Sequence, residues 1–278
     1  MIISYLAPKG GVGSSTLALL TAVQQATDRS VLLIDAADDP SMDLYTSTEN
    51  SVPQTSFEEL SRTRSAVRDI DRLILVRLEP AAIPDRIGLE NWLEEEGISE
   101  VVIDWSALTD ESLIRAITIS DKLIVVLTQD NSVLRAADRL LGTIRSGGGQ
   151  AGFIINQWED RDVRELGDRA EIFDLIEEDY YGSLSFDHEL RFAMNRGKPL
   201  EVSSKIAAEI QEICAKIYQI PDFDDDPAAE EDPLCVDQAV SEVPDEPSPE
   251  EHPTALEQLP QREGVIARIR SFFRSGRG

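Results

Sequence analysis

The sequence predicts an α/β fold with a mostly parallel, doubly wound sheet flanked by helices. Three observations support this prediction. Short, nearly continuous apolar runs alternate with segments of helical periodicity, as expected for strands that are buried on both faces. The regular alternation of the two patterns favours parallel strands joined by crossover helices. A glycine-rich loop, residues 10–13, separates the first strand from the first helix.

The elements are expected in order along residues 1–220. Apolar, β-branched runs predict strands at 2–6, 30–35, 73–78, 100–104, 122–128 and 152–156. Helical periodicity predicts helices at about 15–27, 86–96, 111–119, 131–146 and 161–178. Ligands of doubly wound sheets bind beyond the carboxyl ends of the strands, so residues at those ends are the candidates for function.

Charge divides the chain of 278 residues, whose net charge is −27, into three parts. Residues 221–260 hold 14 acidic residues, no basic residue and eight of the 14 prolines. We expect a disordered linker there, because such a segment buries too little apolar surface to offset its ordering entropy. Residues 261–278 carry +4, which leaves −17 on residues 1–220. An acidic domain argues against nonspecific binding of nucleic acid.

The chain is expected to work in the cytoplasm. Its longest apolar runs are too short to span a bilayer, and residues 1–7 lack the basic start of a secretory signal. Cys214 and Cys235 lie in unlike contexts, which argues against a disulfide framework or a cysteine-based metal site.

The loop after the first strand has the composition of a phosphate-binding loop. It reads Ala7-Pro8-Lys9-Gly10-Gly11-Val12-Gly13-Ser14-Ser15-Thr16. Its three glycines let backbone N–H groups converge on phosphate oxygens, and the helix that follows directs its positive end to the same point. Ser15 or Thr16 offers a hydroxyl to Mg²⁺. The alternative is a tight turn that only starts a helix with Ser and Thr caps.

The pattern K-G-G-x-G-x-[ST]-[ST] resembles the deviant Walker A loop of the ParA/MinD superfamily, a group of SIMIBI-class P-loop NTPases. The resemblance covers most of residues 1–220. Asp35 is similar to the switch I aspartate of that family, and Asp104 to the Walker B aspartate. Asn156 matches the position that reads the adenine edge. Residues 192–200, FAMNRGKPL, resemble the late motif A-x-x-x-G-x-P, which precedes a closing helix.

The resemblance implies ATP and Mg²⁺ as cofactors and a homodimer that forms on ATP binding. In this family the early lysine, here Lys9, reaches across the dimer interface to the partner's nucleotide. The resemblance assigns catalysis to Lys9 and Asp35, and metal binding to Ser15 and Asp104. Asp39 is a further catalytic candidate, as a possible replacement for the residue that orients the attacking water. It assigns nucleotide binding to Lys9, Gly10, Gly11, Val12, Gly13, Ser14, Ser15, Thr16 and Asn156.

Departures from the family pattern predict at most a slow ATPase. Ser14 stands where an ordinary P-loop has the lysine that contacts the β- and γ-phosphates. Ala37 stands where many members have an acidic residue that orients the attacking water; Asp38 or Asp39 could replace it if the loop is one residue longer. Loss of a charge-stabilising group commonly costs ~10²–10³ in rate.

The same departures resemble the BcsQ branch of the superfamily. The hydroxyl at Ser14, the stretch 35–39 and the strand end 155–157 support this narrower resemblance. It implies a role at the inner membrane in bacterial cellulose synthesis and secretion. Pilus-assembly proteins of the TadZ/CpaE type also have degraded Walker loops. They usually have an extra N-terminal receiver-like domain, whereas this sequence starts at the first strand.

The C-terminal segment 261–278 predicts a basic amphipathic helix. Its apolar stripe consists of Val265, Ile266, Ile269, Phe272 and Phe273, flanked by Arg268, Arg270 and Arg274. This pattern favours an anionic membrane surface, so we expect a protein peripheral to the inner membrane. A groove on a partner protein and self-docking on the acidic domain are the alternatives.

Three functions follow from these patterns. The first is a nucleotide-switched dimer that localises or assembles an inner-membrane secretion complex. The second is a ParA-type ATPase that positions DNA or other cargo, and the third is a pseudo-ATPase scaffold without a nucleotide switch. His188 and His252 are isolated, the pair Asp187/Glu189 is interpreted as a loop or helix start, and Trp92 and Trp158 as packing residues.

Overall fold

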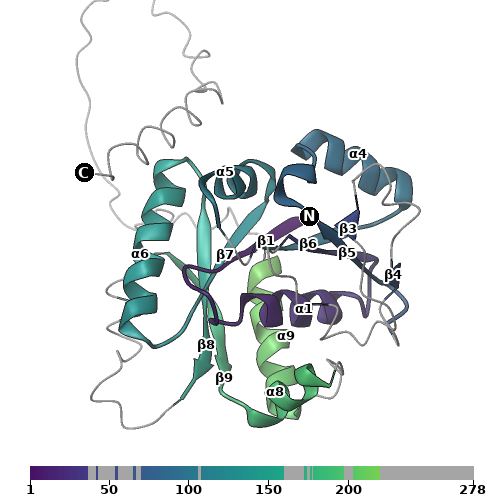
Figure 1. Cartoon of the computed structure of the whole chain (residues 1–278). Helices are drawn as coiled ribbons and strands as arrows, with labels where there is room; N and C mark the ends of the chain where they lie inside the picture. Colours follow the sequence, from purple (N-terminus) through teal and green to yellow (C-terminus); the bar gives the residue numbers. More distant parts are fainter. Residues whose placement is uncertain are drawn as a thin grey trace, which may run out of the picture.

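The computed structural model describes residues 1–36, 42, 54–55, 65–66, 70–105, 108–159, 172–173, 176, 178–196 and 203–219 (Figure 1). The predicted linker at 221–260 and the predicted helix at 261–278 lie outside the described residues. Most of the predicted helix at 161–178 does so as well. These three expectations therefore stay predictions.

One sheet forms the centre of the described domain. Its strands are β1 (Ile2–Leu6), β2 (Val31–Asp35), β3 (Gln54–Thr55), β4 (Ser65–Ala66), β5 (Leu73–Leu78), β6 (Glu100–Trp105), β7 (Lys122–Leu127), β8 (Ala151–Trp158) and β9 (Asp179–Ser185). Their order is β3-β5-β2-β6-β1-β7-β8-β9, and each of these neighbours pairs in parallel. The short β4 pairs antiparallel with β5. The predicted parallel, doubly wound sheet is confirmed.

Helices cover both faces of this sheet (Figure 1). They are α1 (Ser14–Gln25), α4 (Arg86–Glu96), α5 (Asp110–Ile119), α6 (Asn131–Ser146), α8 (His188–Asn195) and α9 (Ser204–Tyr218), with a 3₁₀ turn η2 (Pro80–Ala82). Helices α1 and α9 pack against each other on one face, where α1 contacts β1, β2 and β6. In Figure 1, α4 and α5 lie on the opposite side of the sheet, and α6 packs against β7 and β8.

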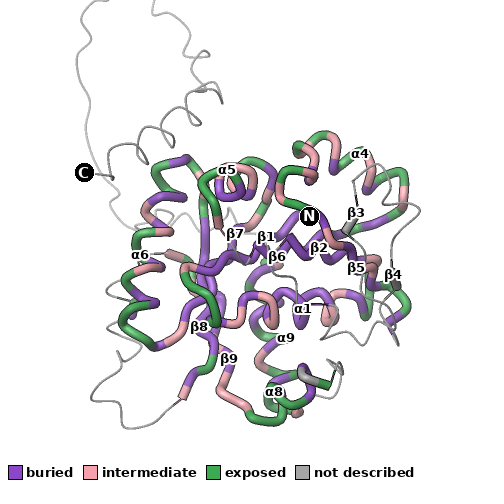
Figure 2. The backbone as a smooth tube through the Cα atoms, viewed as in Figure 1, coloured by how far each residue is buried: buried purple, intermediate pink, exposed green. Residues whose placement is uncertain are grey.

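The predicted strands and the four predicted helices within the described residues all form. Their ends differ from the predictions by at most two residues. The central strands β1, β2 and β6 are buried along their whole length, which explains why their apolar runs are nearly continuous (Figure 2). Helix α9 is the closing helix that the late motif implies.

Strand β9 and helix α8 were not predicted. The β9 sequence, DYYGSLS, has a glycine at its centre and no Val, Ile or Thr, so its strand signal is weak although it contains two tyrosines. Gly182 has φ 146°, and a Cβ atom there would lie 2.7 Å from Cγ1 of Ile213. The glycine thus lets α9 approach β9 closely. This requirement comes from the packing of two distant segments and leaves no pattern in the local sequence.

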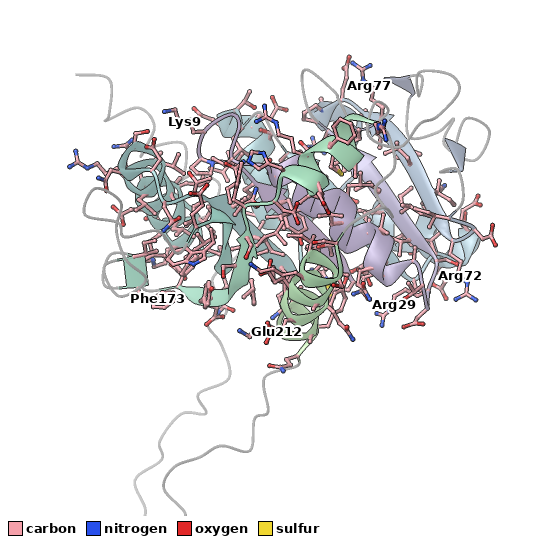
Figure 3. All side chains as sticks on the ribbon, turned by 90° about the horizontal axis from the view of Figure 1, so that it is seen from below. Lys9, Arg29, Arg72, Arg77, Phe173 and Glu212 are labelled. Carbon is pink, nitrogen blue, oxygen red and sulfur yellow. The ribbon has the colours of Figure 1, made fainter. Side chains whose placement is uncertain are left out.

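The parallel strands all begin at one edge of the sheet and all end at the opposite edge. Figure 3 places Lys9 and Arg77 at the edge where the parallel strands end, and Arg29 and Arg72 at the opposite edge. The glycine loop leaves β1 at the first edge. None of the helices in the described ranges is long and apolar enough to cross a membrane.

Candidate functional site

The glycine loop is held in shape by the end of β8. The Nδ2 atom of Asn156 donates a hydrogen bond of 2.8 Å to the carbonyl oxygen of Val12, and the Asn156 side chain is buried. Gly13 caps α1 with φ 88°, and a Cβ atom there would lie 2.1 Å from the same Nδ2 atom. Only glycine fits this position, because it tolerates the positive φ and leaves space for the Asn156 side chain. The structure therefore gives Asn156 a contact that the sequence did not suggest.

The loop has free space around Gly10 and Gly11. A Cβ atom on Gly10 or Gly11 would meet no protein atom within 4 Å. The loop leads directly into α1, whose first residues are Ser14 and Ser15. Backbone N–H groups at the start of a helix, with free space before them, form a site suited to phosphate oxygens.

Ser14 is almost fully buried at the first position of α1. The position that ordinarily holds the phosphate-contacting lysine thus holds a short side chain without charge. The local positive charge of the loop comes from Lys9 alone.

Two carboxylates lie side by side at the ends of β2 and β6. Asp35 and Asp104 are register partners on neighbouring parallel strands, and both are buried. The Oδ2 atom of Asp35 accepts a hydrogen bond of 3.3 Å from the backbone N of Met42, and the carbonyl of Asp104 accepts one of 3.0 Å from Ala36. Two adjacent buried carboxylates are costly unless a cation or hydrogen bonds compensate their charge.

These residues fit a magnesium ion that is bound together with phosphates. Within the described residues, no group of three or more His, Cys, Asp or Glu side chains forms a metal cage. Mg²⁺ commonly takes one or two carboxylates and completes its shell with phosphate oxygens and waters. Asp35 and Asp104 beside an open phosphate loop match that donor set, with Ser15 as the hydroxyl donor that the sequence predicts.

Lys9 is the residue before the glycines of the loop, and its side chain contacts helix α6. Its Nζ donates a hydrogen bond of 2.9 Å to Oγ of Ser132, in the first turn of α6. Asp130 caps that helix, and its Oδ1 accepts from the backbone N atoms of Ser132 and Val133 at 2.6 Å and 3.3 Å. Hydrogen bonds from Ser132 lower the pKa of Asp130, as do the bond from Val133 and, to a smaller extent, the nearby Lys9. Sequence reasoning missed Ser132, although Asp130-Asn131-Ser132 has the composition of a helix cap.

A cavity of about 360 Å³ lies on the same side of the loop as Lys9. Residues 7–10, the start of α5 and the middle of α6 line it. Its lining is mixed, with Leu113 and Leu140 beside Asp110 and Arg139.

The end of β8 contains a bulge that the sequence did not predict. The register with β9 shifts between Ile155 and Trp158, and Gln157 within it has φ 56°. Trp158 is buried, as the packing interpretation predicted, and Trp92 packs partly buried against the core. The interpretation of Asp187 as a helix start is also confirmed, since it caps α8.

Several predicted site residues lie outside the described residues. These are Asp39, with the neighbouring Ala37 and Asp38, and all residues of the C-terminal segment. Their predicted roles in orienting water and in binding a membrane or partner are untested.

The loop, the paired strand-end carboxylates and the sheet order agree with a comparison against protein families. Residues 3–200 match the family described as "CobQ/CobB/MinD/ParA nucleotide binding domain". The chain belongs to this family. The broad resemblance to ParA and MinD proteins is thereby confirmed, whereas the narrower BcsQ resemblance stays a prediction.

Individual members of this family are similar over most of the chain. The septum site-determining protein MinD of Synechocystis sp. is 25% identical over 222 residues, which cover 74% of this chain and 84% of that protein. A chain of the MinC:MinD cell division protein complex of Aquifex aeolicus has a TM-score of 0.69 and 21% identity, covering 79% of this chain and 97% of that one. MinD of Pyrococcus horikoshii, in a complex with Mg-ADP, has a TM-score of 0.66 and 18% identity, covering 78% and 96%.

Proposed function

We propose that the chain binds ATP with Mg²⁺ and uses the bound nucleotide to switch between monomer and homodimer. The glycine loop carries this proposal, because it is open in front of Gly10 and Gly11 and is fixed from behind by Asn156. Backbone N–H groups of the loop and α1 would bind the phosphates. Asp35, Asp104 and Ser15 would hold the metal, which neutralises phosphate charge when bound.

The position of Lys9 supports dimerisation. The side chain is exposed and contacts Ser132, outside the mouth of its own loop. A lysine placed there is accessible to a phosphate group that a second copy of the chain brings. The contact with Ser132 is solvent-exposed and costs little to break. Lys9 would therefore leave Ser132 when the partner's nucleotide arrives.

Hydrolysis is expected to be slow. Ser14 supplies at most one hydrogen bond, where an ordinary loop supplies a positive charge during phosphoryl transfer. Lys9 would have to provide that charge from the partner, so turnover would depend on dimer formation. A purified chain that hydrolyses ATP as fast as active P-loop ATPases, without contaminating activity, would contradict this proposal.

The experiment that tests the switch is sedimentation velocity with ATP–Mg²⁺, with ADP–Mg²⁺ and without nucleotide. We expect a dimer only with ATP, and a monomer in every condition for Lys9→Ala. Lys205→Ala is the matched control, because Lys205 is an exposed lysine on α9. The same mass in all conditions, with no nucleotide bound, would instead favour a pseudo-ATPase scaffold, an alternative that the buried Ser14 supports.

We further propose that the dimer localises or assembles an inner-membrane complex for cellulose secretion. This step is supported by the sequence resemblance of Ser14, residues 35–39 and residues 155–157 to BcsQ proteins. Purification of the tagged full chain from native membranes should then recover cellulose synthase subunits. Tight, salt-sensitive DNA binding would favour ParA-type positioning instead, and recovery of pilus subunits would favour a TadZ/CpaE-like role.

A further inference from the structure

We propose that the cavity beside Lys9 is a docking site for residues 230–237 of the same chain, and that docking keeps Lys9 away from a partner's nucleotide. The inference rests on the nucleotide switch proposed above and names a device that regulates it. The docking itself involves no nucleotide, so it can be measured separately from the switch.

The cavity offers an apolar surface. Its volume of about 360 Å³ is at the lower end of the range for ligand pockets, which suits a few side chains. Ala7 and Leu113 in its lining are buried, and Leu108 and Leu140 are half-buried. Apolar side chains that enter this space are removed from water, which favours binding.

The charged residues of the lining favour an anionic occupant. Lys9 and Arg139 are both exposed, against one exposed acid, Asp110. Arg139 lies two turns along α6 from Ser132, the residue that Lys9 contacts, so both cations lie along the same side of that helix. Asp110 is the first residue of α5, where the positive end of the helix offsets part of its charge. The cavity therefore carries positive charge on a domain whose net charge is −17.

Residues 230–237 have the matching pattern. Leu234, Cys235 and Val236 form the longest apolar run within 221–260, and acidic residues stand on both sides of it. The run fits the leucines of the cavity, and the carboxylates fit its two cations. The segment 261–278 has the opposite charge and is the poorer match. The whole stretch reads Glu230-Glu231-Asp232-Pro233-Leu234-Cys235-Val236-Asp237.

The chain is long enough to bring this segment to the cavity. Helix α9 starts beside Asp187, which follows β9, and its last residue, Tyr218, lies against Arg29 at the opposite edge of the sheet. With 15 residues, α9 is about 22 Å long. Residues 220–234, also 15 in number, span up to about 50 Å when extended. The segment can therefore return to the edge where the glycine loop lies.

Docking sets a threshold for dimer formation. A segment in the cavity occupies the space next to Lys9, so Lys9 stays on Ser132 until the segment leaves. Weak affinity is enough, because a short flexible tether gives an effective concentration on the order of 1 mM. A dissociation constant of about 0.1 mM for the free segment then makes the docked state about ten times more populated than the undocked state.

Cys235 reports docking directly, because it lies in the middle of the apolar run. The other cysteine, Cys214, is buried, and burial raises its pKa to about 11, so it reacts slowly with thiol reagents. The test measures how fast N-ethylmaleimide modifies Cys235 in the full-length chain without nucleotide, relative to the rate in urea. We expect about tenfold protection that does not depend on protein concentration.

A charge reversal tests the site of docking. Arg139→Glu should remove most of the protection of Cys235. Arg135→Glu is the matched control, since Arg135 is exposed on α6 outside the cavity lining, and it should keep the protection. Equal protection in the wild type and Arg139→Glu would overturn the inference, as would a wild-type Cys235 that reacts as fast as in urea. Protection that grows with protein concentration would also overturn it and favour a second copy in the cavity.

A change in the segment tests the regulation. The double substitution Leu234→Ser and Val236→Ser should remove the protection and shift ATP-induced dimer formation to lower protein concentration. Leu256→Ser with Leu259→Ser, in the same linker, is the control and should change neither. A protected Cys235 in a chain that binds no nucleotide would overturn the proposed switch and its regulation, and would leave the docking site standing.

Discussion

The amide of Asn156 joins two parts of the chain that lie 144 positions apart. It fixes the carbonyl of Val12 and leaves no room for a side chain at position 13. A loop that is held in its binding shape before the ligand arrives loses less entropy on binding. At the scale of single residues, the phosphate site therefore depends on a side chain from the far end of the domain.

This dependence gives a prediction for Asn156→Ala. The variant loses the bond to Val12, so the loop samples other conformations. We expect the affinity for tripolyphosphate and for ATP to fall together by about tenfold, the scale of one buried hydrogen bond. Isothermal titration measures both. A loss confined to ATP would mean that Asn156 acts on the base and contributes nothing to the shape of the loop.

At the scale of elements, Asp187 connects two helices that follow β9. Its Oδ1 accepts from the backbone N atoms of Glu189 and Leu190 at 2.6 Å and 3.2 Å, which caps α8. Its Oδ2 accepts from Oγ of Ser203 at 2.8 Å, and Ser203 caps α9. Hydrogen bonds from Ser203, Leu190 and Glu189 lower the pKa of Asp187, against a desolvation effect that raises it. One carboxylate thus fixes the starts of both helices.

We expect Asp187→Ala to destabilise the domain by about 1–2 kcal/mol, the typical cost of losing a helix cap. Asp187→Asn is the matched control, because asparagine caps helices about as well. Urea unfolding followed by circular dichroism measures the difference. Equal midpoints for the wild type and Asp187→Ala would show that the cap adds nothing to the packing of α9 against β9.

A second element-scale feature lies at the opposite edge of the sheet. Glu100 begins β6 and is fully buried, with Arg29 3.3 Å away as its ion-pair partner. Burial raises the pKa of Glu100 to about 7, although Arg29 and the N-terminal ammonium group lower it in part. Tyr5 and Cys214 are further titratable groups close to this carboxyl.

The sign of the resulting pH dependence follows from the raised pKa. The folded chain keeps a proton on Glu100 that the unfolded chain releases near the ordinary pKa of 4.5. The contribution to stability is therefore complete below about pH 4.5 and is lost as pH rises through about 7. A rise of the pKa from 4.5 to about 7 corresponds to roughly 3 kcal/mol.

Glu100→Gln should remove the loss of stability that occurs as pH rises, because glutamine does not ionise. We expect the variant to be more stable than the wild type at pH 8, with a smaller change in melting temperature between pH 5 and pH 8. Glu95→Gln is the control, since Glu95 is an exposed glutamate on α4. The prediction is wrong if both variants follow the wild-type pH profile.

The sequence contained most of the fold because its strands are buried on both faces and its helices have regular periodicity. Strand β9 escaped detection because Gly182 serves contact with Ile213 on α9, and such a contact leaves no local pattern. The positions of the loop and of Asp35 and Asp104 at the carboxyl ends of strands were predictable, because the strand pattern and the resemblance to the ParA/MinD family both point to those ends. The bond of Lys9 to Ser132 and the bulge at Gln157 were not, because both result from packing between distant segments.

At the scale of the whole molecule, charge separates the acidic domain from the segment 261–278. Residues 1–220 carry −17 and residues 221–260 carry −14, while the last 18 residues carry +4. If the predicted helix binds anionic lipid, electrostatics will hold the rest of the chain away from the bilayer surface. Binding would then depend on the C-terminal segment alone.

We expect deletion of residues 261–278 to abolish sedimentation of the chain with vesicles of anionic phospholipid. The reason is that the apolar stripe and its arginines supply both the buried area and the charge attraction. A matched control replaces Phe272 and Phe273 by serine, which keeps the charge and should weaken binding severalfold. If the shortened chain still sediments with the vesicles, the membrane role is wrong, and a partner groove or self-docking is favoured for the segment 261–278.

The arrangement around Trp105 has a practical consequence. This indole follows Asp104 at the end of β6, is completely buried, and donates through Nε1 to Oγ of Ser4 at 2.9 Å, which in turn contacts Oγ of Ser120 at 2.6 Å. Its emission should be blue and sensitive to charge arriving at the neighbouring carboxylate. With Trp92 and Trp158 replaced by phenylalanine, the chain would have Trp105 as its one tryptophan, next in sequence to the candidate metal ligand Asp104. Ligand arrival could then be followed in real time without any label.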